Sequence, residues 1–491
     1  AMDWQKIQVR EEKNLGKKTI EENTITEGII WKQLLIFFFP IMLGTLIQQL
    51  YTTVDTIIVG RFVGKAALAS VGGPAAVLST IVVTFFNGLA NGAAVVIAQY
   101  YGAKDKGRLH TGLHTAYLFS IVVSLVISVV GAVLTPWLLK IMNTPQDMMA
   151  SSTTYLRIYF MGILFTLVYN MGAAIMRAVG DSKRPLLYLV VCCVLNIGLD
   201  IFMVVILKMG IAGAALATVF SQCVSAFLVT WSLTKDYDSM KLQFRELRME
   251  ASVLKRELKI GIPGALQACA YGVTNVVIQA SINSFGTDTA AGWAAYGKLD
   301  LIFWTVSSAL GAAVTTFVGQ NYGAGKWDRV YKSIRVNIGI SYVFTGMIIF
   351  TLYAFCEPMY HMFTTDPKVI DIGVYMLRFL IPSYLLSILL ENLDGGLRGV
   401  GDVLWPTIFT FGGLFLIRLP WVMILTPIYH KVEILLISYP IAWGGTLLFV
   451  IPYYFWKKKK CFNKICSENK AKFMDFCEII LKSQKILYNK Q

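Results

Sequence analysis

Long apolar segments alternate with short polar segments along almost the whole chain. Runs such as 113–133, 186–207 and 211–231 contain almost no charged residue. A helix needs about 20 apolar residues to cross the roughly 30 Å hydrocarbon core of a bilayer, and only helices or closed barrels satisfy their backbone there. These runs are too long and too uniform for barrel strands, which alternate over about 10 residues. The pattern therefore predicts an all-α integral membrane protein.

The apolar segments predict twelve transmembrane helices, and a polar stretch divides them into two sets of six. The expected spans are 31–59, 69–99, 109–135, 150–178, 184–207, 210–234, 257–284, 289–320, 330–355, 372–399, 405–429 and 433–456. The expected organisation is a terminal segment (1–30), an N-terminal lobe (31–234), a linker (235–256), a C-terminal lobe (257–456) and a basic tail (457–491).

Charge sharpens this picture. Only 15% of the residues are charged and 56% are hydrophobic, whereas soluble domains carry roughly 25% charge. The net charge of +15 collects in short loops after even-numbered spans and in the linker and tail, for example at Lys104, Arg108 and Lys457–Lys460. This bias is typical of cytoplasmic loops and not of a nucleic-acid groove. We expect a multi-pass protein of a bacterial-type plasma (inner) membrane with both termini cytoplasmic, the lipid bilayer as a partner and no nucleic acid. The tail is either a basic helix on the inner leaflet or a solvated segment.

The two sets of six spans contain a repeated sequence. Met176–Asp181 matches Leu397–Asp402, the QYYGA sequence at 99–103 matches QNYGA at 320–324, and Arg157 matches Arg378, all 221 residues apart. Because each half has six spans, both halves enter the membrane from the same side, which makes the repeat parallel. Transporters are often built this way, with substrate held between two rocking lobes. Duplication that serves packing alone is the alternative.

Two acids lie inside spans of the N-terminal half. A charge at the bilayer centre costs about 2.5–3.5 kcal/mol or more, so such residues usually have a function. Asn196 lies one turn before Asp200 and faces the same way, and Thr218 lies on the sixth span. Counted from the outer helix ends, Asp55, Asp200 and Thr218 lie roughly 6–12 Å deep, so they can converge. Their oxygens suit Na⁺, and paired carboxylates equally hold a proton. Helix capping or bonds to outer-loop amides are the alternative.

The C-terminal half carries more charges inside its spans. They are Lys298, Asp300, Glu391, Asp394 and Arg418. Glu391 and Asp394 share a helix face at i, i+3. One interpretation is a structural cluster in which Lys298 or Arg418 pairs with Glu391, and the other is a site for substrate or protons. A cationic substrate also needs aromatic faces, for which the candidates are Phe85, Phe86, Tyr169, Trp293, Tyr296 and Trp304.

The duplicated motifs, together with Pro40 and Asp55 fifteen residues further on, resemble the MATE (multidrug and toxic compound extrusion) family. The resemblance covers about residues 31–456. It implies two six-helix lobes in a V around a central cavity, and a secondary antiporter that exports cationic or amphiphilic organic compounds in exchange for H⁺ or Na⁺ by alternating access. We expect a functional monomer with no cofactor beyond this coupling ion.

The resemblance also assigns roles. The N-terminal half is most similar to the DinF-like branch, which implies a cation site at Asp55, Asn196, Asp200 and Thr218. These four residues would bind the metal if the ion is Na⁺. Tyr155 and Asn170 resemble the supporting polar network of that branch, and Pro40 its helix bend. The NorM-like branch has acids on the seventh and tenth helices, where this chain reads near Tyr271 and Ser387.

Two other classes are less consistent with the sequence. A lipid-linked oligosaccharide flippase of the same superfamily often has about fourteen helices and a basic cavity. An enzyme is not expected, because the sequence shows no GxSxG and no phosphate-binding loop. The four histidines, all at loops or helix ends, suggest no His/Glu metal cluster.

Overall fold

The computed structural model of the protein describes residues 24–237 and 240–488, and, within these ranges, the side chains from Ile25 to Cys461 apart from Lys65 and Ala66. The predicted terminal segment 1–30 therefore lies largely outside the described residues, and so do the side chains of the predicted basic tail beyond Cys461.

The described chain is almost entirely helical. Its elements are α2 (Thr24–Glu27), α3 (Ile30–Phe62), α4 (Lys65–Ser70), η1 (Val71–Ala75), α5 (Ala76–Gly102), α6 (Lys106–Ile141), α7 (Gln146–Ala178), α8 (Lys183–Asp200), η2 (Ile201–Ile206), α9 (Gly210–Lys235), η3 (Phe244–Glu246), α10 (Ala251–Asn283), α11 (Thr287–Gly323), α12 (Trp327–Ala354), α13 (Cys356–His361), α14 (Pro367–Leu380), η4 (Ile381–Ser383), α15 (Tyr384–Val400), α16 (Leu404–Phe411), η5 (Gly412–Arg418), η6 (Trp421–Leu425), α17 (Thr426–Tyr429) and α18 (Val432–Tyr488).

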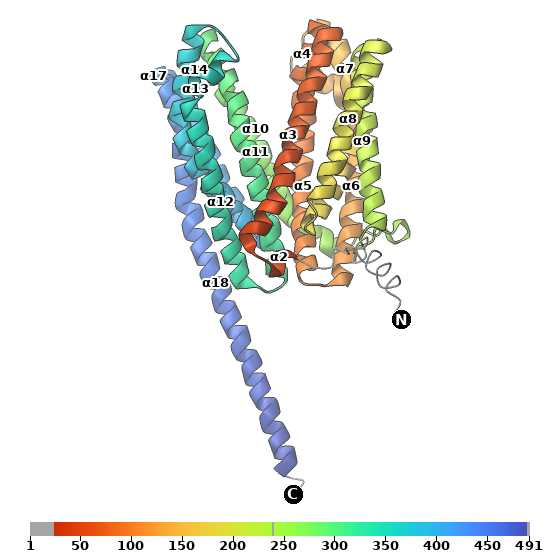
Figure 1. Ribbon diagram of the computed structural model, residues 1–491, viewed down its shortest axis with the longest axis vertical. Helices are drawn as coiled ribbons and strands as arrows, with labels where there is room; N and C mark the ends of the chain where they lie inside the picture. Colours follow the sequence, from red (N-terminus) through yellow and green to blue (C-terminus); the bar gives the residue numbers. More distant parts are fainter. Residues whose placement is uncertain (1–23, 238–239, 489–491) are drawn as a thin grey trace, which may run out of the picture.

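Eleven helical segments of the described chain are long and apolar enough to cross a membrane. The remaining predicted span, 257–284, corresponds to α10, which has 33 residues and runs beside the others in Figure 1 but is not among the eleven apolar segments. The prediction of an all-α membrane protein is confirmed. Several predicted spans are interrupted by π-helical or 3₁₀ turns, as at Pro74 in η1 and Pro382 in η4, because proline removes a backbone hydrogen bond.

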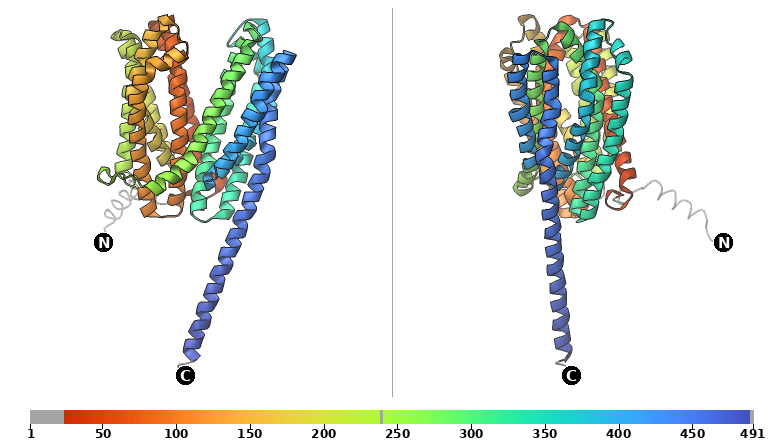
Figure 2. Two further views of the ribbon diagram at one scale, coloured as in Figure 1. Left: turned by 180° about the vertical axis from the view of Figure 1, so that it is seen from behind. Right: turned by 90° about the vertical axis from the view of Figure 1, so that its left-hand side faces the viewer.

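The helices form two bundles arranged as a V (Figure 1). One bundle contains most of α3–α9 and the other most of α10–α18, and the view from behind in Figure 2 shows the same divergence. We call the splayed end, which carries loops 142–145 and 284–286, the wide end. The end where the bundles meet, with loops 103–105 and 324–326, is the narrow end. In Figure 1, α18 continues beyond the narrow end.

The first helix of each half crosses to the opposite bundle near the narrow end. The start of α3 packs on α11, where the rings of Phe37 and Phe317 lie 6.0 Å apart. The start of α10 packs on α5, where a Cβ on Gly88 would overlap Ala265. Pro40 follows the part of α3 that packs on the other bundle, and it is the residue the sequence predicts as a bend. Each half therefore helps to build the other.

Two related glutamines join the bundles at the narrow end. Nε2 of Gln99 donates to the carbonyl oxygen of Gly399 at 2.9 Å, and Nε2 of Gln320 donates to the carbonyl oxygen of Ala178 at 2.7 Å. Both donors and both acceptors are related by the 221-residue repeat. Nη2 of Arg256 also donates to Oε1 of Gln99 at 2.5 Å. We call this set of contacts the narrow-end closure.

Glycine makes this approach possible. A Cβ on Gly102 would overlap the backbone of Gln320, and a Cβ on Gly323 would overlap the backbone of Gln99. These residues are the repeated QYYGA and QNYGA motifs. The duplicated motifs are therefore explained by contact between the bundles.

The other repeated motif forms a turn after α7 and after α15. Gly180 and Gly401 adopt φ of 99° and 88°, which glycine tolerates without strain. The following aspartate accepts a tyrosine hydroxyl in each half, at 2.7 Å from Tyr237 to Asp181 and at 2.6 Å from Tyr453 to Asp402. Burial raises the pKa of Tyr237, so its phenol stays protonated and remains the donor.

Candidate functional site

Two acids meet inside the N-terminal bundle. Asp55 lies on α3 and Asp200 ends α8, and their carboxyl groups are close enough to share a hydrogen bond. Both side chains are buried. Neither oxygen of Asp200 receives a hydrogen bond from the described residues, and nor does Oδ1 of Asp55. Two ionised carboxylates in contact repel each other, so the pair requires a shared proton or a bridging cation.

Two further polar residues were predicted to join the acid pair, Asn196 and Thr218. Asn196, one turn before Asp200, is fully buried, and both of its amide atoms lack a partner among the described residues. Thr218 is buried on α9, which packs against α8, and its hydroxyl donates to the carbonyl of Ala214 at 3.1 Å. Unsatisfied buried polar groups are costly, so Asn196 beside two acids is consistent with a site that holds a small cation.

Three tyrosines complete the surroundings of the acid pair. Tyr155, predicted from the resemblance, lies close to Asp55 and Asp200. Tyr51 and Tyr159 lie there too and were not predicted. Tyr51 is one helical turn before Asp55 and Tyr159 one turn after Tyr155, so the i, i+4 spacing was a signal that could have found them.

Asn170 and Pro40 belong to a different place. They line a cavity of about 300 Å³ together with Arg177 and Tyr169, and its wall is formed mainly by the N-terminal bundle and also by Ser308 of α11. Neither Asp55 nor Asp200 lines this cavity. Of the two residues predicted as a supporting polar network, Tyr155 lies at the acid pair and Asn170 lines this cavity.

A larger cleft of about 620 Å³ lies between the bundles. The N-terminal wall is polar and uncharged, and its polar lining residues are Thr45, Gln49, Thr84, Asn87 and Asn91. These residues recur at i, i+3 and i, i+4 inside apolar spans, a pattern that marks one helix face but was not singled out in the sequence.

The C-terminal wall of the cleft carries charge of both signs. Asp300, Glu391, Arg398 and Arg418 all line it. Asp300 accepts hydrogen bonds from the Tyr384 hydroxyl at 2.5 Å and from Nε1 of Trp304 at 2.9 Å. The acids and bases on this wall are equal in number, so its net charge is close to zero.

The other predicted C-terminal charges do not line the cleft. Asp394 is buried and accepts from Nε2 of Gln267 at 3.2 Å, and Lys298 is exposed. Neither Lys298 nor Arg418 forms an ion pair with Glu391 within 4 Å in the described chain. The guanidinium of Arg418 instead lies 3.4 Å from the centre of the Tyr439 ring. The predicted ion pair between Glu391 and either Lys298 or Arg418 is therefore not formed in the described chain.

Most of the expected aromatic candidates lie outside the cleft. Of the six, Trp304 lines the cleft and Tyr169 lines the smaller cavity. Phe86 is fully buried in the core. The cleft also includes Tyr439 and Trp443, which were not singled out. Tyr271 and Ser387, the positions that carry acids in the NorM-like branch, line it as well.

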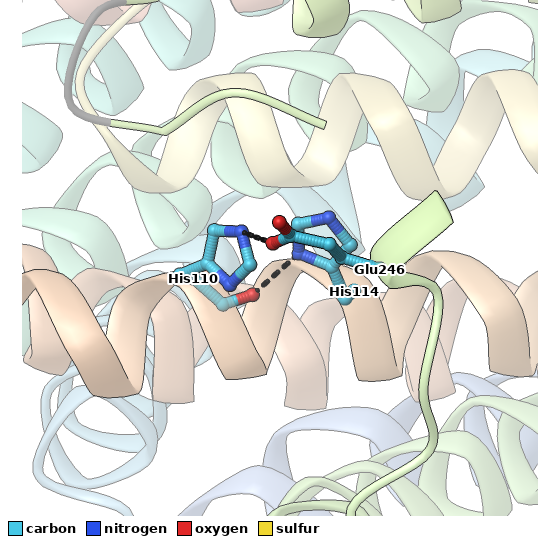
Figure 3. A group of neighbouring side chains, drawn as sticks. All are labelled: His110, His114 and Glu246. Atoms are coloured by element: carbon cyan, nitrogen blue, oxygen red, sulfur yellow. Dashed lines mark hydrogen bonds and ion pairs between the residues drawn. The ribbon is translucent and has the colours of Figure 1, made fainter. Parts of the chain in front are cut away.

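A histidine cluster fastens the linker to α6 near the narrow end (Figure 3). Nε2 of His110 lies 3.0 Å from a carboxylate oxygen of Glu246. Nδ1 of His114 donates to the carbonyl of His110 at 2.8 Å, and its Nε2 accepts from the backbone N–H of Gln243 at 3.0 Å. The sequence suggested no His/Glu metal cluster, but the fold returns the linker to α6 over more than 130 residues and brings His110, His114 and Glu246 together. Both ring nitrogens of His114 are engaged, so this cluster acts as a structural fastening.

Comparison with known proteins identifies the family. The MatE family model matches residues 40–202 and 263–424. The chain belongs to the MatE family. This MATE protein is 30% identical to a probable multidrug resistance protein, YoeA, of Bacillus subtilis (strain 168), over 88% of the chain and 95% of the relative. It is 26% identical to a probable multidrug resistance protein, NorM, of Thermotoga maritima, over 83% and 88%.

Solved structures share the fold of this MATE protein. A MOP superfamily transporter from Pyrococcus furiosus superimposes with a TM-score of 0.82 at 20% identity, covering 90% of this chain and 98% of the other. An outward-facing multidrug resistance MATE transporter gives a TM-score of 0.80 at 21% identity with the same coverage. The resemblance to the MATE family is confirmed, and the MATE protein is a membrane transporter and not an enzyme.

Proposed function

We propose that this MATE protein exports cationic or amphiphilic organic compounds through the central cleft in exchange for a small cation, H⁺ or Na⁺, bound at Asp55 and Asp200. The observation that carries the proposal is the buried contact between these two carboxyl groups, in which Oδ1 of Asp55 and both oxygens of Asp200 receive no hydrogen bond from the described residues. Asn196 and Thr218 would complete the site as oxygen donors, as in the DinF-like branch. Relatives named multidrug resistance proteins support the substrate class.

The exchange follows from electrostatics. A proton or Na⁺ at the acid pair removes the repulsion between the two carboxylates, and its loss restores it. Asp55 and Asp200 lie on different helices, so repulsion between them favours a different packing of α3 against α8. A cation can shift the equilibrium between two conformations only by its difference in affinity for them. Pro40, where α3 leaves the opposite bundle, is the residue expected to permit this repacking.

The orientation follows from charge. The narrow end carries the basic loops, including Lys106, Arg184 and Lys457–Lys460, so we place it and both termini in the cytoplasm of a plasma (inner) membrane. The V then opens outward. A complete cleft and acid pair lie within one chain, which supports function as a monomer.

The flippase alternative is not favoured. Its expected cavity is basic, whereas the cleft of this protein is lined by two acids, Asp300 and Glu391, and by two arginines, Arg398 and Arg418.

The test is transport by purified protein in liposomes, with ethidium as the organic cation and with pH and Na⁺ gradients imposed separately. Wild-type protein should move ethidium against its gradient with at least one of the two ions. Asp55→Asn and Asp200→Asn should each abolish this transport, because one ionisable partner is lost. Asp147→Asn, an exposed aspartate of α7 at the wide end, is the matched control and should transport normally. Transport by both acid-pair variants at the wild-type rate would refute the coupling site.

A further inference from the structure

Arg418 is a buried cation with unused hydrogen-bond donors at the central cleft. Its side chain is only 2% exposed, and it lines the cleft wall. Nε and Nη2 have no hydrogen-bond partner among the described residues. No carboxylate of the described chain lies within ion-pair distance of it. A guanidinium removed from water without a partner is strongly unfavourable, so this arrangement points to a missing acceptor.

The contact with Tyr439 orients the arginine without satisfying it. The guanidinium lies over the ring, with its central carbon 3.4 Å from the ring centre, and this cation–π contact offsets part of the cost of burial. The N–H groups of a guanidinium lie in its own plane. A ring stacked on the face of that plane leaves the N–H groups at the edge free, and the edge is what binds a carboxylate through two parallel hydrogen bonds.

The nearby acid Asp300 is already engaged. Its two oxygens accept from Tyr384 and Trp304, and Tyr384 is itself in contact with the Tyr296 hydroxyl at 3.2 Å. These bonds hold Asp300 in place on α11 and direct its oxygens toward α15 and Trp304. The acceptor that would match Arg418 must therefore come from outside the described chain.

The rest of the cleft fits an aromatic molecule with a second, cationic end. Trp304 and Trp443 line the cleft with ring centres 6.4 Å apart. Glu391 also lines it, and no hydrogen bond to its carboxylate is formed by the described residues, so it is available to a positive group.

We propose that Arg418 binds the carboxylate of amphoteric aromatic substrates, whose positive end faces Glu391. The proposal rests on the proposed export function and narrows its substrate class from organic cations to compounds that carry both a cation and a carboxylate. The cleft then recognises opposite charges on one molecule. The two acids and two arginines that line it therefore serve substrate binding and do not only compensate each other's charge.

The test uses two fluorescent dyes that differ only at the carboxyl group: tetramethylrhodamine, which is amphoteric, and its methyl ester, which is a cation. Binding to purified wild-type protein is measured by fluorescence polarisation. We expect the free acid to bind about tenfold more tightly, since hydrogen bonds between charged groups in a site of low polarity typically contribute this much. This comparison requires no variant and is independent of any folding defect.

Variants then assign the preference to one residue. Arg418→Gln should bind both dyes with the affinity that the wild type shows for the ester. Arg418→Lys should retain part of the preference, because lysine keeps the positive charge but cannot form two parallel hydrogen bonds to a carboxylate. Arg378→Gln is the matched control. Arg378 also stacks on a tyrosine, Tyr353, in the same half, but it is exposed and does not line the cleft, so the preference should survive.

Each result decides between specific alternatives. Equal binding of the two dyes to wild-type protein that still transports ethidium overturns the carboxylate inference and leaves the proposed function standing. It would indicate that water satisfies Arg418. A preference for the free acid that survives Arg418→Gln overturns the assignment to this residue and points to Arg398. Protein that binds neither dye and does not transport ethidium contradicts the proposed function together with this inference.

Discussion

The two halves of this MATE protein share a scaffold but not a chemistry. The N-terminal half holds two acids in contact, Asp55 and Asp200, which do not line the cleft. The residues that this half contributes to the cleft wall are uncharged. The C-terminal half has no counterpart of either acid, since the position 221 residues after Asp200 is Trp421. It instead presents acids and arginines at the cleft itself.

The repeat relates Asn170 to a different side chain, Glu391, and Arg177 to an identical one, Arg398. Asn170 and Arg177 line the smaller N-terminal cavity, and their repeat partners Glu391 and Arg398 line the central cleft. By contrast, the narrow-end closure uses the same glutamine and glycine in both halves. The repeated glutamines and glycines hold the bundles together, and we propose that the acids without an acidic repeat partner, Asp55, Asp200 and Glu391, bind the ion and the substrate.

The largest expected effect lies in the duplicated part. Gly102→Ala and Gly323→Ala each place a Cβ in the backbone of the opposite bundle, and overpacking of this kind costs about 1–3 kcal/mol. Both variants should therefore open the narrow end to a similar extent. Spin labels at Lys106 and Asp328, on a cysteine-free background, measure the distance across it. An effect of one variant without the other would break the symmetry argued here.

A smaller effect should separate the two glutamines. Gln99→Ala removes the bond to Gly399 and a charge-assisted bond from Arg256, which together contribute about 2 kcal/mol. Gln320→Ala removes only the bond to Ala178, or about 1 kcal/mol. The same spin-label pair should show a larger open fraction for Gln99→Ala. Arg256→Gln should remove the difference, and equal opening by both alanine variants would contradict this account.

The C-terminal wall should govern affinity more than coupling. Glu391→Gln removes a carboxylate from the cleft and should weaken ethidium binding about tenfold, close to the loss of one charged hydrogen bond. It should leave the ion dependence of transport unchanged, because the acid pair is intact. Binding by fluorescence and transport in liposomes measure the two properties. Asp147→Asn, which removes an exposed carboxylate at the wide end, should not alter ethidium binding in the cleft.

The smallest effect is expected at His110, which pairs with Glu246 where the linker contacts α6. His110 and Glu246 are both partly exposed, so His110→Ala should cost no more than about 0.5 kcal/mol. His114→Ala should cost about 1–2 kcal/mol, because it leaves the backbone N–H of Gln243 without its acceptor. Thermal unfolding in detergent measures both. A larger loss of stability for His110→Ala than for His114→Ala would show that the cluster is held by charge.

The sequence predicts the duplicated features better than the unduplicated ones. Identities at a fixed offset revealed the repeat, and the count of residues from helix ends placed Asp55 and Asp200 at similar depth. Which side chains meet across helices depends on helix rotation and crossing, which spacing along one helix does not determine. For that reason the stacking of Arg418 on Tyr439 was not foreseen. Asn170 was grouped with the acid pair only through the family resemblance, and it lines another cavity.

The polar N-terminal cleft wall was missed for a different reason. Thr45, Gln49, Asn87 and Asn91 carry no charge, so they do not stand out in an apolar span as an aspartate does. Their helical spacing is the available signal. The His110–Glu246 contact depends on how the linker folds back, and no local pattern encodes that path.

The most direct test of the central claim measures movement of the bundles in response to the ion alone. Spin labels at Gln146 and Asn283, exposed positions at the wide end of each half, report the separation of the bundles without any substrate. In wild-type protein this distance distribution should change when pH or Na⁺ concentration is varied, and in Asp200→Asn it should not respond. An unaltered response in that variant would show that the acid pair does not couple the ion to the conformation.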